Sequence, residues 1–178
     1  MAKVYVVVTA VGRDRRGTVE TITDAVVNHC ANIEESRMAR LGGEFAVIML
    51  LSLAAENLTP LTEDLKGLSE KGLTLTTRET DLSRIEAFRG YVPYEISVFG
   101  ADHEGIVNSV ARSLASERIN VEEMDTRVTP APNTGTPLFS MYARVQAPPE
   151  LSLRQLREKL AKVGRKLDVD IEVKVPLS

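Results

Sequence analysis

Two short segments bounded by glycine carry the residue types best suited to binding a small anion. Residues 12–17 read Gly-Arg-Asp-Arg-Arg-Gly and residues 100–105 read Gly-Ala-Asp-His-Glu-Gly, so both have the form Gly-x-Asp-x-x-Gly. Each segment follows a β-rich apolar run and precedes a stretch of helical periodicity. A strand-to-helix turn presents unpaired backbone N–H groups at the positive end of the helix dipole. We therefore expect each turn to be able to hold a carboxylate.

The glycines of these turns have separate predicted roles. A glycine at the first position, Gly12 or Gly100, allows the chain to leave the strand with a positive φ. A glycine at the sixth position, Gly17 or Gly105, has no side chain, so another backbone segment or a small ligand can approach it. The alternative is that these glycines serve close packing alone.

The aspartates of the two turns, Asp14 and Asp102, are candidates to receive the ammonium group of a free amino acid. Asp14 is also a plausible N-cap, which would make Gly17 the third residue of the helix. In that structural alternative the aspartate satisfies backbone N–H groups and binds no ligand.

The charges around the two turns differ. Arg15 and Arg16 lie at the positive end of the first helix, where a positive charge is unfavourable by about 0.3 kcal/mol or more. Glu104 of the second turn has a favourable sign. A bound anion, either a ligand carboxylate or an acidic partner, would explain the arginines. The alternative is that both side chains extend into water.

An asparagine follows each predicted first helix at the same distance from its turn. Asn32 and Asn120 open the second strand of each repeat, as Asn-Ile and Asn-Val. One interpretation is a helix-exit turn, for which asparagine is well suited. The other is a side-chain amide that hydrogen-bonds an amino-acid ligand.

The two turns and the two asparagines are related by a constant offset of 88 residues, which indicates an internal duplication. In each half the periodicity predicts the order β-α-β-β-α-β, the split βαβ arrangement of ferredoxin-like domains. We predict an α+β protein with two such domains in tandem, residues 1–86 and 87–178. The expected strands are 3–11, 32–41, 44–53 and 73–78 in the first repeat, and 94–99, 120–128, 138–145 and 169–175 in the second.

Three further features distinguish the repeats. Residues 80–90 are mixed in charge and are predicted to be a linker with a short extension of the strand before it. Residues 129–137 form a longer, proline-rich hairpin that is expected not to pair as ordinary sheet; it is either a mobile tip or an arm that covers a ligand or partner. The first and third strands of the first repeat are apolar on both faces, so we expect the other repeat or a second copy of the chain to cover the free face. The alternative is that the extra valines on this face are there by chance.

Composition narrows the class of protein. A net charge of −3 and a pI near 5.5 argue against a nucleic-acid-binding surface. The single cysteine, Cys30, cannot form an internal disulfide and is expected to be a buried thiol. No signal peptide and no apolar run near ~20 residues is present, so we expect a cytoplasmic protein without membrane contact.

The two turns and the two asparagines together resemble the ACT domain. Two such units in fewer than 180 residues, with no catalytic domain, are similar to the glycine cleavage system transcriptional repressor family, as is the Thr136-Pro137-Leu138-Phe139 end of the longer hairpin. The resemblance implies that an amino acid binds at an interface between two units. The implied ligand-binding residues are Gly12, Asp14, Gly17, Asn32, Gly100, Asp102, Gly105 and Asn120.

The resemblance also implies a function without catalysis. The expected protein senses an amino acid, with glycine as the first candidate, and regulates transcription of glycine and one-carbon metabolism through a protein partner such as a transcription factor. It is expected to be a homo-oligomer and to need no cofactor, no metal and no direct contact with nucleic acid. His103 between Asp102 and Glu104 is the only cluster with acid–base potential. The alternative is a stand-alone regulatory subunit, or split-off regulatory domain, of a metabolic enzyme.

Overall fold

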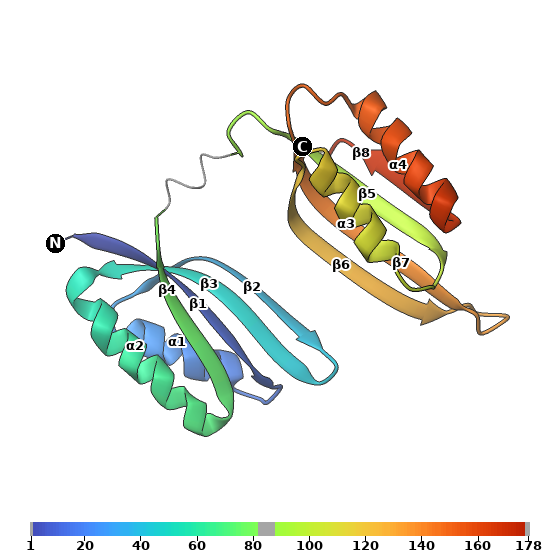
Figure 1. Ribbon diagram of the computed structural model, residues 1–178. Helices are drawn as coiled ribbons and strands as arrows, with labels where there is room; N and C mark the ends of the chain where they lie inside the picture. Colours follow the sequence, from blue (N-terminus) through green and yellow to red (C-terminus); the bar gives the residue numbers. More distant parts are fainter. Residues whose placement is uncertain (1, 82–87, 177–178) are drawn as a thin grey trace. The chain divides into compact units, whose positions relative to one another are not determined.

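The chain divides into two compact units, Met1–Glu86 and Ala87–Ser178. The computed structural model of the protein describes residues 2–81 and 88–176. Most of the expected linker, residues 82–87, therefore lies outside the described residues. Each unit is an antiparallel four-stranded sheet with two helices over one face (Figure 1), which confirms the predicted α+β fold of two βαββαβ repeats.

The first unit has the sheet order β2-β3-β1-β4. Its elements are β1 (Lys3–Arg13), α1 (Thr18–Asn28), β2 (Asn32–Leu41), β3 (Glu44–Ala54), the 3-10 turn Ala55–Asn57, α2 (Leu58–Gly67), the 3-10 turn Leu68–Lys71 and β4 (Leu73–Thr80). Gly42 and Gly43, which join β2 to β3, both have positive φ, as a two-residue hairpin loop requires. The expected extension of the last strand is present, because β4 continues to Thr80.

The second unit repeats this arrangement in the order β6-β7-β5-β8. Its elements are β5 (Val92–Ala101), α3 (Ile106–Ser116), β6 (Asn120–Pro130), β7 (Pro137–Ala147), α4 (Leu153–Leu167) and β8 (Val169–Lys174). Ser152 caps α4 in a capping box with Gln155, so the start of this helix is stabilised by its own side chains.

The core of each unit lies between its sheet and its two helices. Alternate residues of the central strands supply it, such as Val6 and Val8 in β1 and Ile96 and Val98 in β5. From the helices come leucines and isoleucines that are almost fully buried: Ile22, Leu61 and Leu65 in the first unit, and Ile106, Leu114, Leu156 and Leu160 in the second.

The other face of the two sheets differs between the units, in the way that the strand sequences indicate. In the first unit it is apolar, and Val11 and Ile48 are 48% and 49% exposed. In the second unit the corresponding face carries polar residues such as Ser97 and Arg144. It stays a prediction that a second copy of the chain or the other repeat covers this apolar face of the first unit.

Two local expectations were wrong. Cys30 is exposed rather than buried, because it lies in the turn that follows α1, where its φ is 53°. The proline-rich hairpin pairs further than expected, since Pro130 faces Pro137 at the end of the β6–β7 ladder. Proline is tolerated there because this pair ends the ladder, so only residues 131–136 form the loop.

Candidate functional site

The first glycine of each turn lies within a strand, contrary to the expectation that it leaves the strand at positive φ. Gly12 is in β1 and Gly100 is in β5, and neither has a positive φ. A Cβ on Gly12 would lie 2.6 Å from the carbonyl oxygen of Gly72, and one on Gly100 would lie 2.7 Å from Cγ1 of Val169. These positions therefore need glycine for close packing between neighbouring strands.

The sixth residue of each turn is the N-cap of the following helix. Gly17 precedes α1 with a φ of 82°, and Gly105 precedes α3 with a φ of 90°. No side chain caps either helix. The prediction that Asp14 is the N-cap, with Gly17 as the third helical residue, was therefore wrong. The helix starts later because Gly17 is in the left-handed conformation, which cannot continue a right-handed helix.

The two aspartates have the same backbone position and different side-chain partners. The backbone N–H of Asp14 donates to the carbonyl oxygen of Gly43, and that of Asp102 donates to the carbonyl oxygen of Pro137, each at 3.0 Å. A backbone hydrogen bond therefore joins each turn to the hairpin of its own unit. The Asp14 carboxylate accepts a hydrogen bond from Arg40 at 3.1 Å. Within the described part of the chain, no side-chain hydrogen bond or ion pair holds the Asp102 carboxylate.

The fourth residue of each turn reaches the far end of the second helix of its unit. His103 Nε2 lies 2.7 Å from the carbonyl oxygen of Leu167, the last residue of α4. In the first unit, the Nη2 atom of Arg15 would lie 3.9 Å from a Cβ on Gly72, the residue that follows the second helical segment. The Arg15 guanidinium is thus near a helix C-terminus, where positive charge is favourable, although its backbone is at a helix N-terminus.

The structure separates each asparagine from the turn of its own unit. Asn32 pairs with Ser52, which pairs with Tyr5, at the opposite end of β1 from Gly12. Seven residues at about 3.3 Å each put roughly 23 Å between the two ends of the strand. Asn120 pairs with Gln146 in the same way, at the end of the second sheet remote from Gly100. One small ligand cannot contact both parts within one unit.

The sequence analysis did not identify the glutamates that accompany the asparagines. The strand register shifts between Ile33 and Glu35, so Glu34 is the extra residue of a β-bulge, and the same shift brackets Glu122 in the second unit. Glu34 accepts hydrogen bonds from Ser52, Lys3 and Asn32, which lower the pKa of its carboxyl group.

The bulge of the second unit has a simpler set of contacts. Glu122 accepts a hydrogen bond from Gln146 at 3.1 Å. The signal that could have found both glutamates is the repeated Asn-x-Glu-Glu at an offset of 88 residues. Since bulges re-aim a side chain at defined positions of a sheet, their presence at equivalent positions indicates that both repeats use the same local geometry.

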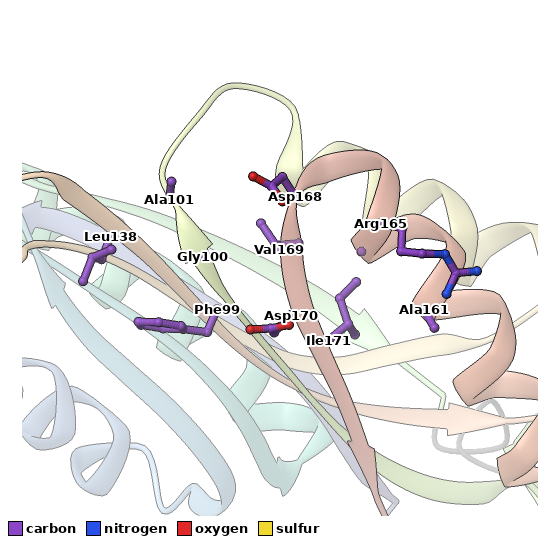
Figure 2. A pocket seen from close by; sticks show the side chains of 11 residues that line it. Phe99, Gly100, Ala101, Leu138, Ala161, Arg165, Asp168, Val169, Asp170 and Ile171 are labelled. Atoms are coloured by element: carbon purple, nitrogen blue, oxygen red, sulfur yellow. The ribbon is translucent and has the colours of Figure 1, made fainter.

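An open hollow of about 500 Å³ lies beside the second turn, at the ends of β5 and β8 (Figure 2). Phe99, Leu138 and Asp170 line it on one side, while Arg165 and Ala161 of α4 line it on the other. Asp168 stands at the corner between α4 and β8, one residue after the carbonyl that contacts His103. The hollow therefore offers both signs of charge next to an apolar surface.

Other kinds of site were also considered. Among residues 2–81 and 88–176, no group of three or more His, Cys, Asp or Glu side chains could hold a metal ion. None of the helices in the same part of the chain has the length and apolar character needed to cross a lipid bilayer.

Comparison with known proteins gives consistent results. Residues 4–78 match the family model of the ACT domain. The glycine cleavage system transcriptional repressor of Escherichia coli (strain K12) is 35% identical over 131 residues, which are 72% of this chain and 67% of that protein. The crystal structure of an unknown protein from Galdieria sulphuraria is 34% identical, with a TM-score of 0.84 over 99% of this chain and 100% of the other.

A second solved structure supports the fold. It is provisionally assigned as a glycine cleavage system transcriptional repressor, and it matches with a TM-score of 0.73 and 23% identity over 98% of each chain. Together with the duplicated turns and the two βαββαβ units, these matches show that the chain is a tandem ACT-domain protein that belongs to the glycine cleavage system transcriptional repressor family.

Proposed function

We propose that this protein is an amino-acid-sensing regulator that acts on transcription of glycine and one-carbon metabolism through a protein partner. Its identity to the repressor of Escherichia coli supports the regulatory part of the proposal. The ACT-domain match of residues 4–78 and the repetition of the same fold in the second unit support the amino-acid part of the proposal. The observation that carries the proposal is a turn that combines an uncapped helix N-terminus with a carboxylate.

The second turn is the better of the two candidate sites. The helix start at Gly105 has no side-chain cap, so its backbone N–H groups are available to a ligand carboxylate. Asp102 can then receive the ligand ammonium group. At the first turn the corresponding carboxylate of Asp14 is paired with Arg40, which would have to be displaced. We propose Gly100, Asp102 and Gly105 as the primary binding turn and Gly12, Asp14 and Gly17 as a weaker one.

Asn32 and Asn120 can contact the ligand bound at a turn only at an interface between two units. Because each asparagine lies a full strand length from the turn of its own unit, a ligand that contacts a turn and an asparagine must bridge two units. Such a ligand favours the arrangement that closes on it, so binding would act by a population shift. Homo-oligomer formation is part of the proposal for the same reason, since the second unit can come from another copy.

A thermal-shift screen against the twenty amino acids, followed by calorimetry, tests ligand binding. A ligand at a hundredfold excess over its dissociation constant should add about 2.7 kcal/mol to the free energy of unfolding. Asp102→Asn should remove this stabilisation. Asp24→Asn, which changes an exposed carboxylate of α1, is the matched control and should retain it. Loss of the effect in both variants, or in neither, would contradict the proposed turn.

The regulatory part needs a separate measurement. In cells that lack this protein, transcripts for glycine cleavage should respond less to added glycine than in cells that carry it. The Asp102→Asn variant should behave like the deletion, while Asp24→Asn should restore the response. A normal response in the deletion strain would contradict the role in transcription and would favour the regulatory subunit of an enzyme.

A further inference from the structure

Both ring nitrogens of His103 face backbone carbonyl oxygens. Nε2 lies 2.7 Å from the oxygen of Leu167, and Nδ1 lies 3.0 Å from the oxygen of Glu104. A carbonyl oxygen accepts hydrogen bonds and cannot donate them. Both contacts can therefore be hydrogen bonds only when both ring nitrogens carry a proton, as in the imidazolium ion.

The two carbonyls belong to different parts of the second unit. Glu104 is in the turn that precedes α3, while Leu167 is the last residue of α4. The next residue, Asp168, adopts a left-handed conformation and leads directly into β8. A doubly protonated His103 thus joins the turn to the corner between α4 and β8, which also borders the hollow in Figure 2.

The first unit makes the equivalent approach with a side chain that does not titrate. Arg15 is the counterpart of His103 in the repeat, and it reaches Gly72, which closes the second helical segment before β4 just as Asp168 does before β8. Arginine keeps its positive charge at every pH that a folded protein meets, whereas histidine changes charge near neutrality. The same corner is therefore approached by a permanent cation in one repeat and by a titratable one in the other.

We propose that His103 is a positioning residue that makes the second turn, but not the first, sensitive to pH. As the imidazolium it holds the turn against the α4–β8 corner, and as the neutral ring it releases one of the two carbonyls. The consequence for ligand affinity rests on the proposed function, because it assumes that the second turn binds an amino acid. The loss of one His103 hydrogen bond on deprotonation does not depend on that assumption.

The groups around His103 together favour its protonated form. The carbonyl of Leu167, followed by that of Glu104, raises the pKa of His103, and the carboxylates of Asp102 and Asp168 act in the same direction. The last turn of α4 also carries Arg165 and Lys166, whose positive charges act in the opposite direction. Because the pKa is raised on folding, the stabilising contribution is complete below about pH 6.5 and is lost as the pH rises through the folded pKa.

Proton NMR of the full chain tests this without any ligand. The chain has two histidines, so a His29→Gln variant assigns the His103 imidazole signal. We expect a His103 midpoint above pH 6.5, and we expect the backbone amide signals of Gly105 and Asp168 to shift with the same midpoint. A midpoint at or below 6.5, or an Asp168 signal that does not follow the ring, would overturn the proposal.

Two substitutions separate positioning from a general loss of structure. His103→Arg, which copies Arg15, should keep the turn in place and remove the pH dependence of the Gly105 and Asp168 signals. His103→Gln, which is neutral, should be less stable than the wild type below pH 6.5, and the difference should disappear as the pH rises above the His103 midpoint. Equal stability of His103→Gln and wild type across the whole range would contradict the proposal.

Calorimetry with glycine then addresses the link to function. Wild-type affinity should fall as the pH rises through the His103 midpoint, and the affinity of His103→Arg should not. If neither protein binds glycine while the NMR midpoint is raised, the proposed ligand fails and the pH-sensitive contact stands. If glycine binds wild type and His103→Arg with the same pH dependence, the positioning role of His103 is overturned.

Discussion

The Oδ2 atom of Asp14 lies 3.1 Å from the Nη1 atom of Arg40, so the carboxylate of the first turn is bound to strand β2 rather than to the helix that follows it. Asp102 has the same backbone position in the second turn, but Val128 occupies the place of Arg40 in the repeat. This pair is one of the differences in chemistry between the two turns, although both have the form Gly-x-Asp-x-x-Gly.

The contribution of the Asp14–Arg40 pair to stability should be small. Both side chains are accessible to water, at 32% and 73%, so a double-mutant cycle of Asp14→Asn and Arg40→Gln should give a coupling of about 0.2–1 kcal/mol. Urea unfolding at low and high salt measures it, and the coupling should decrease with salt. A coupling that is large and independent of salt would contradict this assignment.

Adding a methyl group at Gly12 or Gly100 should destabilise the protein. A Cβ at Gly12 would lie 2.6 Å from a backbone oxygen that cannot move by itself. Overpacking of this kind typically costs about 1–3 kcal/mol, so the midpoint of chemical unfolding should fall clearly in Gly12→Ala and Gly100→Ala.

Gly67→Ala is the matched control for these two variants. Gly67 is the last residue of α2, with ordinary helical φ and ψ, and an added Cβ would meet no atom within 4 Å in the described structure. This change should be neutral or stabilise by up to about 1 kcal/mol, because alanine favours the helix. A loss of stability as large as that of Gly12→Ala would contradict the packing argument.

The left-handed conformation of Gly105 should make this position sensitive to the backbone preference of the residue. A Cβ there meets nothing within 4 Å in the described part of the chain, so Gly105→Ala should lose about 1–2 kcal/mol from strain alone. Gly105→Asn should lose less, since asparagine adopts this conformation more readily. Thermal unfolding of both variants measures the difference, and a ranking with alanine above asparagine would refute the strain explanation.

Glu34 should contribute to stability in a manner that depends on pH. Hydrogen bonds from Ser52, Lys3 and Asn32 lower the pKa of its carboxyl group. A lowered pKa means that the contribution is present above the ordinary value of 4.5 and is lost as the pH falls through the folded value. As the pH is lowered, the free energy of unfolding of Glu34→Gln should therefore fall less than that of the wild type.

Urea unfolding from neutral to acid pH provides this measurement. Glu63→Gln, which changes an exposed carboxylate in the middle of α2, is the control and should keep the acid dependence of the wild type. An unchanged acid dependence in Glu34→Gln would show that the bulge network contributes nothing through its charge.

Much of this protein could be predicted from local pattern. The offset of 88 residues, the order of strands and helices, the Gly42-Gly43 hairpin and the alternating polar face of the second sheet depend on periodicity and turn chemistry, which are properties of neighbouring residues. Membership of the ACT-domain family could be recognised for the same reason, since its turn motif and its strand-opening asparagine are short segments.

The tertiary structure decided which of these residues meet. Strand register brings Arg40 to Asp14, and sheet packing brings Leu167 to His103, across 26 and 64 residues of sequence. The strand order puts Asn32 at the far end of β1 from Gly12, which no spacing along the chain reveals. Contacts between distant segments depend on how strands align and helices pack, and a single sequence encodes them only through the whole fold.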